Sequence, residues 1–196
     1  SSAASDVYKR QGHGFPIFGN KRITEALSTT SEFLTSIETQ TLEMMNKGKR
    51  LNEIIHSVKI SEELTKLPWL RPVYDDPEFL IRMVWRRYGG WWDGEYDRLL
   101  PASRSEESKI WIELSGGLEV IIKKALSLSD GGNDKLAAHL IETAFYSDET
   151  NQKVHEARKI IYNNFASKQE SSMARNILNH ASIASGKNKR DLAETD

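Results

Sequence analysis

Apolar side chains recur every three or four residues along most of this chain, and clusters of glycine and proline interrupt the pattern at short intervals. That spacing places the apolar side chains along one face of an α-helix. It predicts helices over residues 20–46, 51–58, 62–67, 77–89, 106–114, 118–127, 134–146, 151–167 and 171–185. The predicted fold class is therefore all-α.

Local signals support several of these boundaries. Ser61 precedes an acidic first turn, as a helix N-cap does, and Pro77 follows Asp76 as the first residue of the next helix. Short connections between the later helices predict antiparallel neighbours, and hence a helical bundle. The helices over 134–146 and 151–167 carry alanines where two helices could cross closely, so they resemble a tetratricopeptide-like hairpin.

The segment from Trp85 to Gly94 contains three of the five tryptophans and three of the twelve glycines of the chain. Each tryptophan brings a large apolar area and one N–H that needs a partner, and paired glycines let the backbone turn sharply. We expect a helix end that folds back under aromatic side chains. It would line either a pocket or a contact between subunits.

Composition excludes some functions and leaves others open. The chain has 196 residues and a formal net charge of −1, from 27 basic and 28 acidic residues, so no overall field favours nucleic acid or an anionic membrane. It has no cysteine, which excludes disulfides and thiolate metal ligands. No apolar run approaches the roughly 20 residues that a transmembrane helix needs. The sequence assigns no cellular compartment.

Several motifs, taken together and in order, resemble the dimerisation region of alkyl sulfatases of the metallo-β-lactamase superfamily. They are Arg71-Pro72-Val73-Tyr74, Tyr88-Gly89-Gly90-Trp91-Trp92-Asp93-Gly94, Leu99-Leu100-Pro101 and Ser115-Gly116-Gly117. The resemblance covers most of residues 12–183. It implies that the all-α bundle over residues 49–185 is a dimerisation domain, preceded over residues 12–48 by the tail of an αββα metallo-β-lactamase domain and followed over residues 186–196 by a flexible tail.

The first residues are set aside. Asp6 to Gln11 resembles the translation of an adapter used to prepare sequencing libraries, so we interpret residues 1–11 as an artefact. We therefore expect the natural chain to begin further upstream. A signal peptide or a catalytic motif in that upstream part would not be visible here.

His13 is the candidate metal ligand. From the residues alone, a histidine in a loop rich in glycine and proline is either a plain loop residue or a ligand. The resemblance implies the second role, because a histidine in an H-x-x-P-x-x-G loop closes the two-zinc site of the alkyl sulfatases. One histidine cannot hold catalytic zinc, which takes about three protein ligands. The sequence contains no H-x-H-x-D-H motif, so we expect the fragment alone to be metal-free and inactive.

Tyr88, Gly90 and Arg87 are the candidate substrate-binding residues. A guanidinium, a phenol and glycine N–H groups could together hold a tetrahedral anion such as a sulfate ester. The resemblance favours Tyr88 and Gly90, because similar enzymes use a tyrosine and neighbouring backbone near the sulfate. The plainer alternative is that Tyr88 packs in the core and the arginine is solvated.

Two functions remain open. The resemblance implies a fragment of a zinc-dependent alkyl sulfatase, whose whole enzyme hydrolyses primary alkyl sulfate esters such as dodecyl sulfate with a zinc-activated water. The fragment would supply homodimerisation and part of the active-site wall. The alternative is a tetratricopeptide-like interaction module without chemistry of its own. Helical periodicity supports both, whereas the loop around His13 and the tryptophan-rich segment favour the first.

Overall fold

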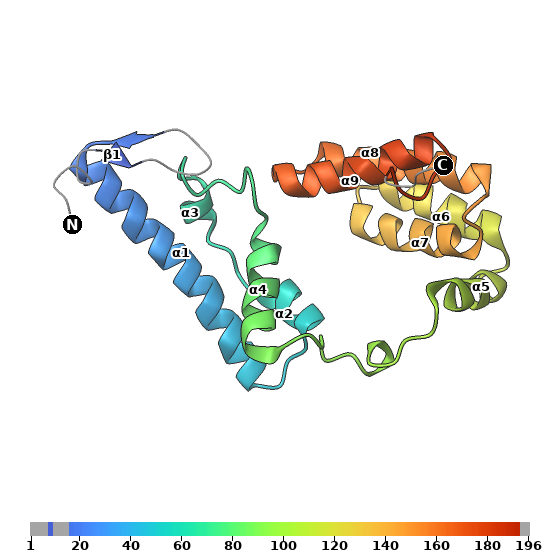
Figure 1. Cartoon of the computed structure of the whole chain (residues 1–196), viewed down its shortest axis with the longest axis horizontal. Helices are drawn as coiled ribbons and strands as arrows, with labels where there is room; N and C mark the ends of the chain where they lie inside the picture. The colour runs from blue at the N-terminus through green and yellow to red at the C-terminus, as the bar shows by residue number, and fades with distance from the viewer. Residues whose placement is uncertain (1–7, 10–15, 193–196) are drawn as a thin grey trace. The chain divides into compact units, whose positions relative to one another are not determined.

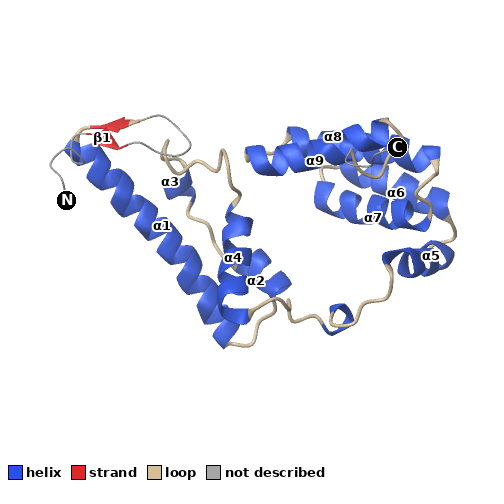
Figure 2. Ribbon diagram, viewed as in Figure 1, coloured by secondary structure: helices blue, strands red, loops and turns tan. Residues whose placement is uncertain are grey.

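The computed structural model describes residues 8–9 and 16–192, in which helices dominate (Figure 1). Two short strands, β1 (Tyr8–Lys9) and β2 (Ile17–Phe18), precede the helices (Figure 2). The helices in chain order are α1 (Asn20–Asn46), α2 (Leu51–Ser57), α3 (Glu62–Thr65), α4 (Pro77–Gly89), the 3-10 turn η2 (Tyr96–Arg98), α5 (Arg104–Leu114), α6 (Leu118–Asp130), α7 (Asp134–Ser147), α8 (Gln152–Ser167) and α9 (Ser172–Gly186). The predicted helical character is confirmed for the described residues.

The helix ends follow the signals in the sequence. The Asp76 carboxylate accepts a hydrogen bond from the Glu78 N–H at 2.8 Å and caps α4, whose first residue is Pro77. The Ser61 hydroxyl accepts from the Leu64 N–H at 3.2 Å and caps α3 in the same way. These two predicted starts are therefore correct.

Several boundaries and one element differ from the prediction. Helix α5 begins at Arg104 rather than at residue 106, because Ser103 Oγ accepts from the Glu106 N–H at 3.2 Å and caps the helix earlier. Helix α6 continues past residue 127 to Asp130, shortly before Gly132 turns the chain with a φ of 80°. The antiparallel pairing of β1 with β2, Tyr8 opposite Phe18, was not predicted, since two-residue strands show no alternation.

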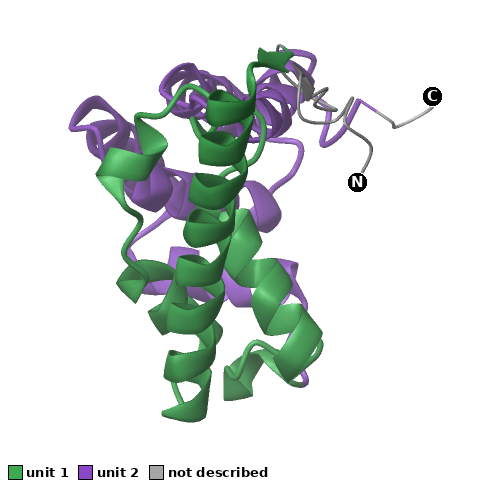
Figure 3. Cartoon of the chain, turned by 90° about the vertical axis from the view of Figure 1, so that its left-hand side faces the viewer, with its two compact units in different colours: residues 1–99 green, residues 100–196 purple. Residues whose placement is uncertain are grey.

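The chain forms two compact units, residues 1–99 and residues 100–196 (Figure 3). In the first unit, α1 packs against α4 and α2. Its core consists of buried side chains from these three helices, namely Phe33, Ile37, Ile54, Ile55 and Ile81. This core fixes the helix α4, from whose end the tryptophan-rich segment leaves. The predicted domain boundary between residues 48 and 49 stays a prediction.

A smaller cluster lies at the beginning of α1. It contains the buried side chains of Ile17, Ile23 and Ala26, with Trp69 packed against them. The Trp69 Nε1–H donates to Thr29 Oγ1 at 2.9 Å, so the polar atom of this ring is satisfied. The connector after α3 is thereby attached to α1.

The second unit is built from α5 to α9. Buried apolar residues of α6, α7 and α8 form its core, namely Ile121, Ile122, Ala125, Ala137, Ile141, Ala144, Phe145, Val154, Ala157 and Ile161. Helices α8 and α9 lie side by side (Figure 1). They are antiparallel, because α9 begins shortly after α8 ends, and Arg158 in the first half of α8 donates to Ser185 near the end of α9 at 2.8 Å. Helix α5 packs on α7 at the edge of this bundle.

No helix among the described residues has both the length and the apolar character that a membrane-spanning segment needs.

Candidate functional site

The tryptophan-rich segment folds back beneath the end of α4, as its sequence predicts. The Trp85 Nε1–H donates to the Trp92 carbonyl at 2.8 Å, and the Trp92 Nε1–H donates to the Glu95 carbonyl at 2.9 Å. Both rings are half-buried, whereas Trp91 is 78% exposed. Two of the three indole N–H groups therefore hold the loop itself in shape, and the third tryptophan faces solvent.

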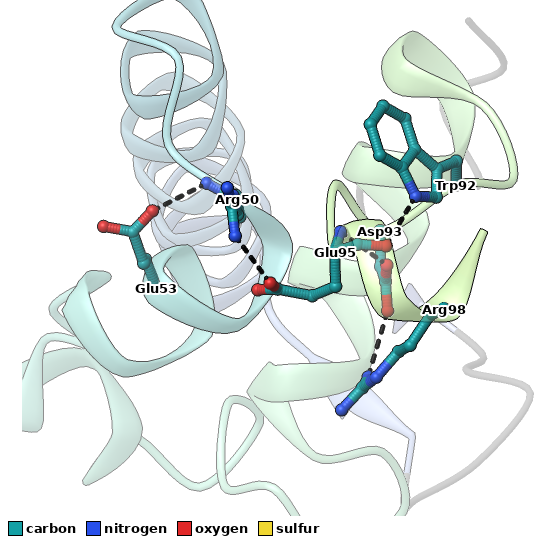
Figure 4. A network of polar contacts seen from close by, with 6 residues as sticks. All are labelled: Arg50, Glu53, Trp92, Asp93, Glu95 and Arg98. Atoms are coloured by element: carbon teal, nitrogen blue, oxygen red, sulfur yellow. Dashed lines mark hydrogen bonds and ion pairs between the residues drawn. The ribbon is translucent and has the colours of Figure 1, made fainter. Parts of the chain in front are cut away.

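Arg50, immediately before α2, fastens this loop to the rest of the first unit (Figure 4). One of its guanidinium nitrogens donates to Glu95 Oε2 at 2.7 Å, and its guanidinium carbon lies 4.9 Å from the centroid of the Tyr96 ring. The bond to Glu95 holds the pKa of the Arg50 guanidinium above its usual value. The Leu51 N–H also donates to the Asp93 carbonyl at 3.1 Å, so backbone and side chain both tie the loop to α2.

Asp93 organises the turn that follows. Its carboxylate accepts from the Glu95 N–H at 3.0 Å and from the Arg98 guanidinium at 3.0 Å (Figure 4). Partial burial raises the pKa of the Asp93 carboxyl, but the hydrogen bonds from Glu95 and Arg98 outweigh that effect and leave the pKa below its ordinary value. The carboxylate is therefore charged at neutral pH, and its two hydrogen bonds hold the turn in shape.

Two glycines of the segment occupy backbone conformations that other residues avoid. Gly90, with φ 86° and ψ −151°, ends α4, and Gly94 has φ 91°. At Gly94 an added Cβ would also lie 3.1 Å from Arg50 Cγ. The glycine at position 94 is thus needed both for the turn and for the close approach of Arg50.

The three predicted substrate-binding residues lie together at the end of α4. The Tyr88 hydroxyl donates to Glu38 Oε1 of α1 at 2.9 Å, and the Tyr88 side chain is 51% exposed rather than packed in the core. The Arg87 guanidinium carbon lies 5.5 Å from the centroid of the Tyr88 ring. Gly90 is exposed two residues further on. Their role in binding sulfate stays a prediction.

His13 lies outside the described residues. Within the ranges 8–9 and 16–192, no group of three or more histidine, aspartate and glutamate side chains could hold a metal ion. Of the other histidines, His155 is buried and its Nε2 lies 2.9 Å from the Glu149 carbonyl, while His180 Nε2 lies 2.7 Å from Asp191 Oδ1. Both contacts are structural.

Sequence reasoning missed Arg50, Glu95 and Glu38. Arg50 and Glu95 are 45 positions apart, and Glu38 and Tyr88 are 50 apart, so no local spacing connects them. The one local signal was Glu53, whose carboxylate accepts from the Arg50 N–H at 3.0 Å and marks residue 50 as a helix N-cap. That signal identifies the start of α2 but not the partner of the Arg50 side chain.

Comparisons with known proteins agree with the resemblance seen in the sequence. A family model described as alkyl sulfatase dimerisation matches residues 50–185. A linear primary-alkylsulfatase from a Pseudomonas species is 26% identical over 140 residues, which are 71% of this chain and 21% of that protein. An (R)-specific secondary-alkylsulfatase from a Pseudomonas species is 26% identical over 168 residues, which are 85% of this chain and 25% of that protein.

The fold also matches a solved structure. The stereoselective inverting sec-alkylsulfatase Pisa1 from a Pseudomonas species superposes with a TM-score of 0.83 at 24% identity, over 91% of this chain and 28% of that one. This likeness concerns the fold. The chain spans about a quarter of the length of the curated relatives it matches, namely 21%, 25% and 24% of three of them.

Proposed function

The chain belongs to the alkyl sulfatase dimerisation family, and from that membership we propose that it is part of a longer alkyl sulfatase. The longer enzyme would hydrolyse primary alkyl sulfate esters, such as dodecyl sulfate, to an alcohol and sulfate. The family match over residues 50–185 carries this proposal, and relatives named alkylsulfatases support it. The substrate class comes from the primary-alkylsulfatase relatives.

Within that enzyme, we propose that this chain forms a homodimer and contributes part of the active-site wall. The helices of residues 49–185 would supply the dimer contact, some of them as tetratricopeptide-like hairpins. Residues 12–48 would be the tail of a metallo-β-lactamase domain. The alternative, a tetratricopeptide-like interaction module without chemistry, explains the antiparallel α8–α9 hairpin but gives no reason for the tryptophan-rich segment.

Zinc is the proposed metal of the longer enzyme. Catalytic zinc takes about three protein ligands, and the described part of this chain offers no such group. The described residues therefore do not fit a zinc site, and we assign them no step that uses the metal. His13 is the candidate ligand from this chain.

The proposal is tested by producing the longer protein and measuring alcohol release from dodecyl sulfate, with and without a chelator. We expect activity that the chelator abolishes, and a loss of at least about 10-fold in His13→Ala, as is typical when a ligand shell is disturbed. His56→Ala is the matched control, because His56 is an exposed histidine of α2 and should leave activity unchanged. Absence of hydrolysis would favour the interaction module.

Tyr88 is proposed to bind the sulfate group, and its observed partner makes the proposal testable. The hydroxyl has one proton, which it now donates to Glu38, so a sulfate oxygen that accepts this proton must displace the Glu38 carboxylate. The two anions would also repel each other. Glu38→Gln should therefore lower KM for dodecyl sulfate.

Tyr88→Phe removes the donor and should lower kcat/KM about 10-fold, the value of one hydrogen bond to a charged group. Steady-state kinetics of the longer enzyme measure both variants. Unchanged kinetics in Tyr88→Phe would leave this tyrosine with a structural role only.

A further inference from the structure

Trp91 is exposed in the middle of a loop whose other tryptophans are engaged. The rings of Trp85 and Trp92 are half-buried, and their N–H groups donate to backbone carbonyls. The Trp91 side chain is 78% exposed, and among the described residues it has no hydrogen-bond or ring partner. Because tryptophan carries the largest apolar ring system, the loop leaves much of one apolar surface open to a ligand.

The loop around Trp91 is held in one conformation by contacts with the start of α2. The Arg50 guanidinium donates to Glu95 Oε2 at 2.7 Å (Figure 4). The Leu51 N–H donates to the Asp93 carbonyl at 3.1 Å. A binding surface that is already ordered loses little conformational entropy when a ligand settles on it. The exposed indole is therefore a preformed surface rather than a side chain on a loose loop.

The neighbours of Trp91 in the sequence indicate what this ligand is. Gly90 directly precedes it and Tyr88 lies three positions before it, and both are candidate substrate-binding residues at the end of α4. A sulfate ester held by these residues carries an alkyl chain that needs an apolar surface close to the anion. Each methylene buried on such a surface strengthens binding about four-fold.

We propose that Trp91 binds the alkyl chain of the substrate and makes the enzyme prefer long chains. The inference rests on the alkyl sulfatase activity proposed above and adds to it a residue that discriminates among alkyl sulfates. Tyr88 and Gly90 would meet the sulfate group, which all these esters share, so they cannot select chain length. Glu95 is then a positioning residue, because it fixes the loop through Arg50 without touching the substrate.

The test compares decyl sulfate with butyl sulfate as substrates of the longer enzyme, both below the concentrations at which micelles form. The ratio of the two kcat/KM values measures the preference for the long chain. Trp91→Ala should lower this ratio about 10-fold, the effect of between one and two buried methylenes. Trp91→Phe keeps an apolar ring and should keep most of the preference. A loss of folded enzyme cancels from the ratio, because both substrates are measured on one preparation.

Trp111→Ala is the matched control, since Trp111 is a 54% exposed tryptophan of α5 in the other unit and should leave the ratio unchanged. A ratio that does not change in Trp91→Ala overturns the assignment, and so does an equal fall in Trp111→Ala. In both cases the hydrolysis itself leaves the proposed enzyme standing. Absence of hydrolysis of both esters overturns the enzyme and the assignment together.

Glu95→Ala tests whether the fastening of the loop acts through Trp91. Without the partner of Arg50 the loop is less well held, so the ratio should fall a few-fold. The double variant Trp91→Ala with Glu95→Ala should have the ratio of Trp91→Ala alone, because no indole then remains to be positioned. A double variant whose ratio falls by the full product of the two single effects overturns the positioning role of Glu95.

Discussion

Arg50 shows how a single side chain can shape a loop far away in the sequence. Its N–H is bound by Glu53, its guanidinium by Glu95, and its aliphatic stem packs where Gly94 leaves room. Its guanidinium also faces the Tyr96 ring. Because these contacts use different parts of one residue, the start of α2 and the shape of the loop depend on each other.

Asp93 supports a prediction about pH. Its folded-state pKa lies below the ordinary value of about 3.9, so the carboxylate stabilises the fold at pH values above about 4. That stabilisation is lost as the pH falls through the lowered pKa that Asp93 has in the folded state. We therefore expect Asp93→Asn to lower the free energy of unfolding at pH 7 by about 1 kcal/mol, the worth of a hydrogen bond of this kind.

Urea denaturation of both proteins at pH 7 and near pH 3.5 measures the effect. The difference between them should shrink at the lower pH, because the wild-type carboxylate then begins to bind a proton. Asp97→Asn is the control, as Asp97 is an exposed carboxylate in the same turn. A difference that is equal at both pH values would show that the charge of Asp93 is not what stabilises the loop.

At the scale of elements, the helices could be predicted well because their signals are local. Hydrophobic spacing placed α1 within its observed bounds, and Asp76-Pro77 marked the start of α4. The signal for the start of α5, which the prediction missed, is also local, since Ser103 followed three residues later by Glu106 is a capping pattern. Such features depend on a few neighbouring residues, and a single sequence contains them.

The contacts of the candidate site could not be predicted in the same way. The sequence located the tryptophan-rich segment and its fold beneath α4, because indole and glycine chemistry is local. It did not identify Glu38 as the partner of Tyr88, since that contact depends on how α1 and α4 pack. The exposed positions of Ile110, Trp111 and Leu114 on α5 likewise became known only from the burial of each residue.

A polar network links α7, α8 and α9 in the second unit. Arg158 Nε donates to Glu142 Oε1 at 2.6 Å, and another guanidinium nitrogen donates to Ser185 Oγ. The two side chains of the ion pair are only 8% and 14% exposed. Burial, with the nearby Glu142, raises the pKa of Tyr162, so this phenol stays protonated throughout the physiological range.

Removing one member of the Arg158–Glu142 pair should lower the free energy of unfolding much more than removing both. Arg158→Leu leaves the largely buried Glu142 carboxylate without its ion-pair partner, and we expect it to lower the free energy of unfolding by about 3 kcal/mol or more. Adding Glu142→Leu should recover at least half of that loss, because no buried charge then remains. Chemical denaturation of the single and double variants measures both steps.

The same helix provides a control for this comparison. Lys153 on α8 pairs with Glu119 at 2.6 Å, but both side chains are 69% exposed. Lys153→Leu should therefore change the free energy of unfolding far less than Arg158→Leu, since exposed ion pairs contribute little. Equal losses in the two variants would mean that burial does not determine the strength of the Arg158 pair.

At the scale of the whole molecule, each unit has its own buried apolar core, and the chain passes from one to the other near residue 100. The residues from 99 to 104 are all exposed, and Leu100 is 90% exposed. A segment with few buried contacts opens readily, and proteases cut such segments first. The boundary between the units is therefore a site where cleavage should leave both cores intact.

Brief digestion with chymotrypsin tests this independence. The enzyme cuts after large aromatic residues and, less readily, after leucine, but not before proline. Pro101 therefore protects the bond after Leu100, and the bonds after the exposed Tyr96 and Leu99 are the expected sites near the boundary. We expect a first product that ends at residue 96 or 99 and a second that begins at residue 97 or 100, both identified by their masses. The second should unfold cooperatively on heating, because it keeps the whole core of α6, α7 and α8. Early cuts within α7 or α8, or a second product that melts without a transition, would show that its core depends on the first unit.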